Sequence, residues 1–576
     1  MIKTLKTFFR FIAKKKLIYG LTLISLVATA ILQSVMPYFL KLFVNEIPAL
    51  DYQALINILL IYIAVVMGSL ITDVASNWFG DVVLLDAARD ARLAIFKHVQ
   101  NLDFSFHSNK STGSMISAFK RGDGAFFDLF HTVHFNIIGV IVTTIIMLIF
   151  FGQINFWLVV FMSIALILTF ISTKILIKNN VDKRNIFNDE EDNVSGIITD
   201  NMINYETVKL FAKEKWESTR LTNAFKPWTK SLWGYANSFR LIDIVIGLLI
   251  NISIFAIMFL MLRFSVFGNL GVGDFVLIIS FIGMFFPKIW NLVWSTRNIA
   301  KNYADLEKYF GLLNEKVEVL DPKNPINIGH VYGEIKFKNV SFSYKNRVKN
   351  AINNFDLDIK QGESVALVGR SGSGKTTLVK LLMRFFDITN GEISIDGINI
   401  KDFTKNTLRG FIGMVPQEPI LFNNTVAYNI GYGKENTKLS EIREAAKIAN
   451  IDDFIQSLPK KYETEVGERG VKLSGGQKQR LAIARMILSD PDIVVFDEAT
   501  SQLDSESEKL IQDAFWKARA GKTTLIVAHR LSTIMRADKI VVMEKGKIKE
   551  IGNHKSLLAK KDSLYSHFWN LQIKLD

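Results

Sequence analysis

The residues from 369 to 376 read Gly-Arg-Ser-Gly-Ser-Gly-Lys-Thr and match the complete pattern G-x-x-x-x-G-K-[ST]. Glycines in such a loop let several backbone N–H groups converge on phosphate oxygens, and a helix beginning there adds its dipole. Lys375 would neutralise charge on the terminal phosphates of a nucleotide, and the Thr376 hydroxyl would bind Mg²⁺. The predicted phosphate-binding residues are Gly369, Arg370, Ser371, Gly372, Ser373, Gly374, Lys375, Thr376 and Thr377.

Two buried strands are predicted to position this chemistry. The apolar run 365–368 leads directly into the glycine loop, and residues 376–386 continue as a helix, which is the strand–loop–helix order that the motif requires. The apolar run 493–496 predicts a second strand, which ends at the acidic pair Asp497 and Glu498. We expect Asp497 to hold the magnesium ion, through water.

A second motif follows the loop, Leu-Ser-Gly-Gly-Gln at 473–477. It resembles the signature peptide of the ATP-binding cassette (ABC) family, and its pairing with the phosphate loop separates that cassette from other P-loop NTPases. The resemblance implies that Ser474 and Gly476 face the γ-phosphate held by a partner's loop, with Gly475 and Gln477 completing this part of the ATP site. One cassette then cannot complete a site, so the resemblance implies a dimer.

The same resemblance implies roles for residues that lie elsewhere in the chain. Tyr344 would stack on adenine, and Gln417 would sense magnesium. Glu498 would polarise the attacking water, and His529 would contact the γ-phosphate. The implied catalytic residues are Glu498, His529 and Gln417, and the implied magnesium ligands are Thr376, Gln417 and Asp497.

Two further loops bear on the resemblance. Residues 467–470 resemble the X-loop of exporters. The D-loop at 501–504 departs from the family pattern, because Gln502 stands where alanine is usual. This departure puts communication between the two sites in question, but not hydrolysis.

Composition narrows the class of protein. The chain has 576 residues, which exceeds one typical domain, and no cysteine, which excludes disulfides, thiolate metal sites and cysteine nucleophiles. Its net charge is +14, but Lys and Arg gather beside apolar stretches, as in loops that face a cytoplasmic leaflet. The charge therefore indicates a membrane surface rather than nucleic acid.

Long uncharged stretches predict six membrane spans. They are residues 17–40, residues 52–72, two helices within 129–173 separated by a break at 152–155, residues 244–262, and residues 275–295. Lys and Arg cluster before the first span and after the second and fourth, which places both termini and the cassette in the cytoplasm. Residues 1–16 are interpreted as an amphipathic helix on the inner surface.

The two long inner connections, 73–130 and 174–243, are predicted to be helical extensions of the spans. This pattern resembles the exporter fold, whose short coupling helices touch the nucleotide-binding domains. Residues 104–117 and 202–213 are the expected coupling segments. Ordinary cytoplasmic loops with surface charge are the alternative.

One basic residue, Lys288, interrupts the last predicted span. A charged side chain within a span is costly and marks a candidate functional site, so we interpret Lys288 as a candidate residue of the substrate cavity. The alternative is a lysine whose long stem snorkels to the inner interface. In a cavity, its charge would suit an anionic cargo.

The fold class implied by these features is an α-helical six-span membrane domain of the ABC exporter type, followed by an α/β P-loop ATP-binding cassette. The predicted boundaries are 1–315 for the membrane domain, 316–332 for a linker with two prolines, and 333–576 for the cassette. Near alternation of apolar residues from Ile335 to Tyr344 predicts the first strands of the cassette.

The resemblance implies an ATP hydrolase coupled to transport, with ATP and Mg²⁺ as cofactors. A homodimer would export an amphipathic or hydrophobic small molecule, lipid or conjugate by alternating access. Two strings, Phe-His at 106–107 with Thr-Gly at 112–113 and residues 204–209, resemble exporters of the mitochondrial glutathione-conjugate and heavy-metal type. A heterodimer with a related chain, an importer on the same fold, and an ATP-gated channel or regulator are the alternatives.

The expected partners are a second copy, membrane lipid and cargo, but no nucleic acid. The expected location is a prokaryotic inner or plasma membrane, with several passes.

Overall fold

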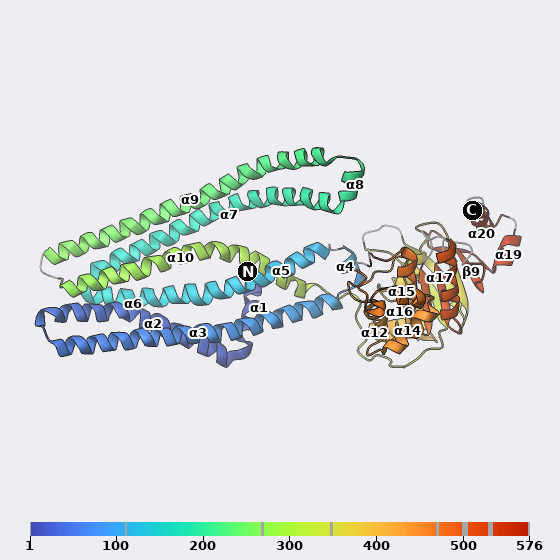
Figure 1. Cartoon of the computed structure of the whole chain (residues 1–576), viewed down its shortest axis with the longest axis horizontal. Helices are drawn as coiled ribbons and strands as arrows, with labels where there is room; N and C mark the ends of the chain where they lie inside the picture. The colour runs from blue at the N-terminus through green and yellow to red at the C-terminus, as the bar shows by residue number, and fades with distance from the viewer. Residues whose placement is uncertain are drawn as a thin grey trace. The chain divides into compact units, whose positions relative to one another are not determined.

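A computed structural model of the chain is shown in Figure 1. It describes residues 2–109, 112–266, 270–345, 350–467, 470, 472–497, 505–527, 534–560 and 562–573. The chain divides into two compact units, which we call the membrane unit (1–101 and 110–315) and the cassette unit (102–109 and 316–576). The short segment 102–109 therefore belongs with the cassette, although both of its neighbours in the chain belong to the membrane unit.

Helices build the described part of the membrane unit, and six stretches there are long and apolar enough to cross a membrane. This confirms the predicted number of spans. The helices are α1 (Ile2–Ile12), α2 (Lys16–Glu46), α3 (Tyr52–Asn101), α5 (Thr112–His131), α6 (Ile138–Ile154), α7 (Phe156–Ile203), α8 (Tyr205–Leu210), α9 (Glu214–Val266) and α10 (Val272–Gly311). Shorter turns are η1 (Ala13–Lys15), η2 (Ile47–Ala49), the π-helical turn η3 (Thr132–Ile137) and η4 (Leu312–Asn314).

The helical inner connections are confirmed. Helices α3, α7 and α9 have 50, 48 and 53 residues, more than twice the roughly 20 that a span needs. In Figure 1, α7 and α9 run side by side, and the short helix α8 joins their ends. α8 is the short helix expected within 202–213.

The ends of the spans follow local sequence with one difference. The break at 152–155 is confirmed, because α6 ends at Ile154 and the Asn155 side chain accepts a hydrogen bond from the Trp157 backbone N–H at 2.9 Å. This caps the first turn of α7. The helix of the last span continues beyond it: the stretch that could cross a membrane is Val272–Ser295, close to the predicted 275–295, whereas α10 includes Pro287 and ends at Gly311.

Two sheets form the described framework of the cassette unit. One is antiparallel with the order β2-β1-β4-β5, and the other has the order β10-β9-β3-β8-β7-β6, parallel except for the β10–β9 pair. The strands are β1 (Ile335–Phe342), β2 (Ile352–Ile359), β3 (Ser364–Val368), β4 (Asn390–Ile395), β5 (Ile398–Asn399), β6 (Ile412–Val415), β7 (Ile493–Asp497), β8 (Thr523–Val527), β9 (Lys539–Glu544) and β10 (Lys547–Gly552).

Helices pack around these sheets. They are α4 (Phe104–Asn109), α11 (Lys375–Leu382), α12 (Lys405–Gly410), α13 (Val426–Gly431), α14 (Leu439–Ile448), α15 (Asp452–Ser457), α16 (Gly475–Ser489), α17 (Ser505–Ala518), α19 (His554–Ala559) and α20 (Leu564–Ile573). The 3-10 turn η5 (Ile400–Asp402) lies between β5 and α12, and η6 (Lys461–Glu463) lies between α15 and α16.

Strand β3 shows why its apolar run is continuous. Successive side chains of a strand point to opposite faces. Val365 and Leu367 pack in the core shared with the antiparallel sheet, whereas Ala366 and Val368 pack in the core formed with the helices α16 and α17. A strand covered on both faces needs apolar residues at every position. The predicted strands at 365–368 and 493–496 are both confirmed.

The helix after the glycine loop ends earlier than predicted. α11 stops at Leu382, four residues before the expected end at Phe386. Arg384 adopts a left-handed φ of +48°, and the Phe385 N–H donates back to the Lys380 carbonyl at 2.9 Å. This is a helix-ending geometry, and it turns Phe385 and Phe386 out of the helix.

Candidate functional site

The predicted phosphate-binding and magnesium residues follow parallel strands of one sheet. The glycine loop follows β3, Asp497 ends β7, and Gln417 comes two residues after β6. The carboxyl ends of parallel strands share one edge of a sheet, where ligands of α/β proteins bind. Strand β8 also ends at this edge, at Val527.

The glycines of the loop are required by geometry. Gly374 has a φ of +107°, and a Cβ there would lie 2.8 Å from Ile352 Cδ1. A Cβ on Gly369 would lie 2.3 Å from the Met543 carbonyl oxygen. A side chain at either position would therefore displace the loop from the sheet edge.

Buried polar groups of the loop match a phosphate ligand. Lys375, at the start of α11, is 4% exposed, and its amine donates to the carbonyls of Gly369 at 2.7 Å and Arg370 at 3.3 Å. The hydroxyl of Ser373 is buried and has no hydrogen-bond partner among the described residues. A buried polar atom without a partner is costly, and phosphate oxygens bound in the loop would supply acceptors.

Asp497 has the properties of a cation ligand. Burial raises the pKa of its carboxyl, and the positive charges of Lys375 and Lys380 oppose that rise. Its side chain is buried at the end of β7. A divalent cation would favour the charged carboxylate, so the residues present fit the magnesium ion that the motif implies.

Tyr344 lies just beyond β1, which ends at Phe342. Its hydroxyl is 3.3 Å from Thr377 Oγ1, on the helix that starts at the glycine loop. This contact holds the half-buried ring beside the loop. The arrangement suits stacking on a base whose phosphates are bound by the loop.

The signature peptide begins helix α16. The Ser474 side chain accepts a hydrogen bond from the Gln477 N–H at 3.3 Å, and Gln477 Oε1 accepts from the Ser474 N–H at 2.8 Å. This reciprocal capping box leaves Ser474 and Gly475 exposed at the N-terminus of a 15-residue helix. Such an end attracts anions.

Several predicted residues lie outside the part of the chain that the structure describes. They are Glu498, His529, Gln502 with the rest of the D-loop at 501–504, and residues 468 and 469 of the X-loop. Their roles remain predictions from the sequence.

Sequence reasoning missed Gln479, which lies one turn into α16. Its Nε2 donates to the carbonyls of Pro416 and Gln417, each at 3.4 Å. The signature helix is thereby tied to the backbone of the predicted magnesium-sensing loop. No motif could have found this residue, because its partners lie more than sixty positions away.

Sequence reasoning also missed Asp103, which directly precedes α4. Its buried carboxylate accepts hydrogen bonds from the backbone N–H groups of Glu318 and Val319, the second at 3.3 Å. On the same stretch, Arg384 donates to the Leu320 carbonyl at 2.9 Å, and the Lys405 amine donates to the Val319 carbonyl at 2.8 Å. Hydrogen bonds therefore hold the segment after residue 315 in two places: to Asp103, just before α4, and to Arg384 and Lys405 in the rest of the cassette unit.

We expect Asp103→Ala to lower the free energy of local opening of the segment after residue 315 by about 1–3 kcal/mol, because two backbone N–H groups lose a charged acceptor. Limited proteolysis of residues 316–326 measures it, and cleavage should become clearly faster. Asp321→Ala is the control, since Asp321 is exposed and accepts one bond, from the Lys405 N–H at 2.8 Å. Equal cleavage of the two variants would contradict the role of Asp103.

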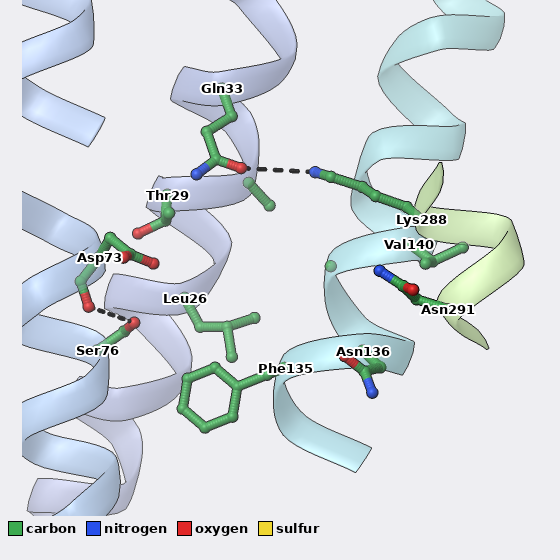
Figure 2. A pocket seen from close by; sticks show the side chains of 12 residues that line it. Leu26, Thr29, Gln33, Asp73, Ser76, Phe135, Asn136, Val140, Lys288 and Asn291 are labelled. Carbon is green, nitrogen blue, oxygen red and sulfur yellow. Dashed lines mark hydrogen bonds between the residues drawn. The ribbon is translucent and has the colours of Figure 1, made fainter. Parts of the chain in front are cut away.

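A second site lies among the helices of the membrane unit. A cavity of about 260 Å³ is lined by residues of α2, α3, η3, α6 and α10 (Figure 2). Gln33, Asp73, Asn136 and Asn291 supply polar atoms, and Lys288 supplies a positive charge. The remaining lining is mostly apolar, from Leu26, Ala30, Phe135 and Val140.

Lys288 is directed across this cavity. Its amine lies 3.5 Å from Gln33 Oε1 (Figure 2). It also lies 3.2 Å from Thr143 Oγ1. Both partners are neutral, and no carboxylate lies within ion-pair distance of Lys288 among the described residues. The π-helical turn η3, which carries Phe135 and Asn136, forms part of the wall. Such turns often occur at functional sites.

The two units define a class of protein: a multi-pass membrane domain joined in one chain to a nucleotide-binding cassette. Two family models match the chain. The ABC transporter transmembrane region matches residues 19–288, and the ABC transporter model matches residues 352–501. The chain belongs to the ABC transporter family, with one membrane domain and one ATP-binding cassette.

Similar proteins and a solved structure support the same family. The chain is 38% identical over 493 residues to "Heavy metal tolerance factor 1" of Caenorhabditis elegans, covering 84% of this chain and 60% of that protein. It is 35% identical over 488 residues to the "ATM1-type heavy metal exporter" of Novosphingobium aromaticivorans, covering 84% and 80%. The "Structure of a bacterial Atm1-family ABC exporter with ATP bound" superposes with a TM-score of 0.85 at 32% identity, covering 97% of this chain and 99% of that one.

These likenesses confirm the family, the fold class and the resemblance to heavy-metal exporters that the short strings predicted. The chain spans about 60% of the length of the worm relative, and 58% of the human "ATP-binding cassette sub-family B member 6", to which it is 38% identical over 489 residues, or 84% of this chain.

Proposed function

We propose that two copies of this chain form an ATP-driven exporter of an amphipathic or hydrophobic small molecule, lipid or conjugate. The observation that carries the proposal is the union, in one chain, of six candidate spans and a cassette in which Lys375 and Asp497 are buried together at one sheet edge. The names of the relatives add heavy metals to the cargo candidates.

In this proposal each part of the cassette acts on ATP. Lys375 counters the phosphate charge, and Tyr344 stacks on the base. Ser474 of one copy approaches the γ-phosphate of the ATP bound by the glycine loop of the other copy. Thr376, Gln417 and Asp497 would hold Mg²⁺, which neutralises phosphate charge when bound. Glu498 would polarise the attacking water, beside His529. The cassette faces the cytoplasm, in agreement with the Lys and Arg clusters beside the spans.

The test is ATP turnover by the purified chain in lipid nanodiscs, wild type beside Glu498→Gln, with lipids, drug-like compounds, glutathione conjugates and metal–thiol complexes added in turn. Glu498→Gln should bind ATP normally but lose turnover. Cargo-stimulated turnover, followed by ATP-dependent uptake of that cargo into proteoliposomes, supports the exporter. Stimulated turnover that never moves cargo would favour a regulator, and a well-folded chain without turnover would favour a heterodimer.

The cavity around Lys288 makes the cargo proposal more specific. The hydrogen-bond partners of the Lys288 amine, Gln33 and Thr143, are neutral, and Asp73, which lines the same cavity, forms no ion pair with it in the described part of the chain. A charge that is removed from water without a close counter-ion attracts an anionic group. We propose that the cargo carries an anionic group that binds Lys288.

Lys288→Met should then raise the concentration of anionic cargo that half-stimulates turnover by about 10- to 100-fold, the factor for one hydrogen bond to a charged group. Basal turnover should stay unchanged, and Lys288→Arg should keep most of the affinity. Lys174→Met, at an exposed position of α7, is the matched control. An unchanged half-stimulating concentration in Lys288→Met would remove Lys288 from the cargo site.

A further inference from the structure

A chain of aromatic contacts runs through the cassette unit from Tyr344 to helix α4. The Tyr344 and Phe386 rings meet edge to face, with centroids 5.3 Å apart and planes at 85°. Phe386 meets Phe104, the first residue of α4, with centroids 6.2 Å apart and planes at 79°. The rings of Tyr344, Phe386 and Phe104 thus form a series of contacts from the proposed base-stacking residue to helix α4.

Phe104 is anchored on the cassette by further contacts. Its ring stacks on Phe385, with centroids 4.9 Å apart and planes at 20°. The Lys380 amine lies 5.3 Å from the Phe104 ring, and the Arg409 guanidinium lies 4.8 Å from the Phe385 ring. Lys380 belongs to α11, the helix that starts at the glycine loop. Helix α4 therefore rests on the end of the phosphate-loop helix.

The early end of α11 makes this arrangement possible. Had the helix continued to Phe386, Phe385 and Phe386 would follow the helical spacing instead of turning together toward α4. The left-handed Arg384 redirects them. One of the two rings then contacts Tyr344, and both contact Phe104.

We infer that the base of the bound nucleotide positions helix α4 through the rings of Tyr344, Phe386 and Phe104. Edge-to-face pairs hold a preferred mutual orientation. A base stacked on Tyr344 fixes that ring, the fixed ring restricts Phe386, and Phe386 restricts Phe104. Phosphates bound at the glycine loop do not stack on the Tyr344 ring, so they restrict it, and hence α4, less than a whole nucleotide does. Phe104 and Phe386 are positioning residues and do not touch the nucleotide. The inference rests on the proposed nucleotide site.

The absence of cysteine from the chain allows a direct test. Ser108→Cys places one thiol at an exposed position of α4, where an environment-sensitive fluorophore is attached. The labelled full-length chain in nanodiscs is titrated with ADP and, separately, with inorganic tripolyphosphate at concentrations that displace ADP. We expect a change in emission with ADP and a much smaller one with tripolyphosphate.

Substitutions in the ring chain provide the second arm. Phe386→Leu keeps an apolar side chain but removes the ring, and it should reduce the response of the label to ADP by about 2- to 10-fold, the equilibrium factor of one aromatic pair. ADP affinity, measured by calorimetry, should stay close to that of the unsubstituted chain. Phe568→Leu, at a half-buried position of α20, is the matched control, and the label in this variant should respond fully to ADP.

The outcomes separate the two proposals. Failure of ADP to bind would overturn the nucleotide site, and the inference with it. Normal ADP binding with an undiminished response in Phe386→Leu would overturn the inference alone. An equal response to tripolyphosphate and to ADP would also overturn it, because the base would then contribute nothing.

Discussion

Lys375→Ala is expected to reduce ATP turnover by at least about 100-fold, the loss typical of removing one preorganised group that stabilises transition-state charge. The amine is held in the loop by the Gly369 and Arg370 carbonyls before any nucleotide arrives. It therefore needs little reorganisation when negative charge moves onto the leaving phosphates. In Lys375→Ala only the proposed Mg²⁺ and the backbone dipoles of the loop remain to stabilise that charge.

Turnover and nucleotide binding should be measured together on the purified chain. Because the proposed site places Lys375 beside the phosphates, ATP affinity should fall as well, which distinguishes this variant from Glu498→Gln. Lys434→Ala is the control, since Lys434 is an exposed lysine paired with Glu441 at 2.7 Å. Turnover by Lys375→Ala close to that of the control would show that the loop does not hold the phosphates.

Gly122→Ala is expected to destabilise the membrane unit by roughly 2–4 kcal/mol, from overpacking and a weakened hydrogen bond. Gly122 lies on α5, and a Cβ there would lie 2.3 Å from Tyr309 Cγ and 2.5 Å from Tyr309 Cβ. These atoms form the base of a buried side chain, so they cannot swing aside. The Tyr309 hydroxyl donates to Asp123 at 2.9 Å, and Asp123 pairs with Arg92 at 2.6 Å. A displaced ring would disturb both contacts.

The matched control lies two residues further along the same helix. A Cβ on Gly124 meets nothing within 4 Å, so Gly124→Ala should stabilise α5 by about 0.5–1 kcal/mol through helix propensity alone. Thermal unfolding in detergent should therefore shift in opposite directions for the two variants. Tyr309→Phe should not rescue Gly122→Ala, because the close atoms are not the hydroxyl. Equal melting temperatures would contradict the close packing of α5 against α10.

Features that depend only on the residues of a single helix, strand or turn could be predicted from the sequence. The strand before the glycine loop was predictable, because a strand buried on both faces must be apolar at every position. The six spans were predictable, because a helix in lipid needs about 20 apolar residues in a row. The turn at Asn155 was predictable from its polar break.

Details at the ends of elements were less predictable. Helix α11 ends at Leu382 because Arg384 turns left-handed and its guanidinium finds the Leu320, Lys401 and Phe403 carbonyls. Those acceptors come from distant parts of the chain, so local helix propensity could not indicate the end.

By itself the sequence determined the family, the nucleotide chemistry and the membrane class of this protein, because each depends on residue types at short, regular spacing. Only the tertiary structure decided that residues 102–109 belong with the cassette, that Asp103 fastens the segment after residue 315, and that Lys288 faces Gln33 and Thr143. Such partners lie 145 to 255 residues apart. Contacts across that separation depend on how whole helices pack, and no local pattern of residues encodes them.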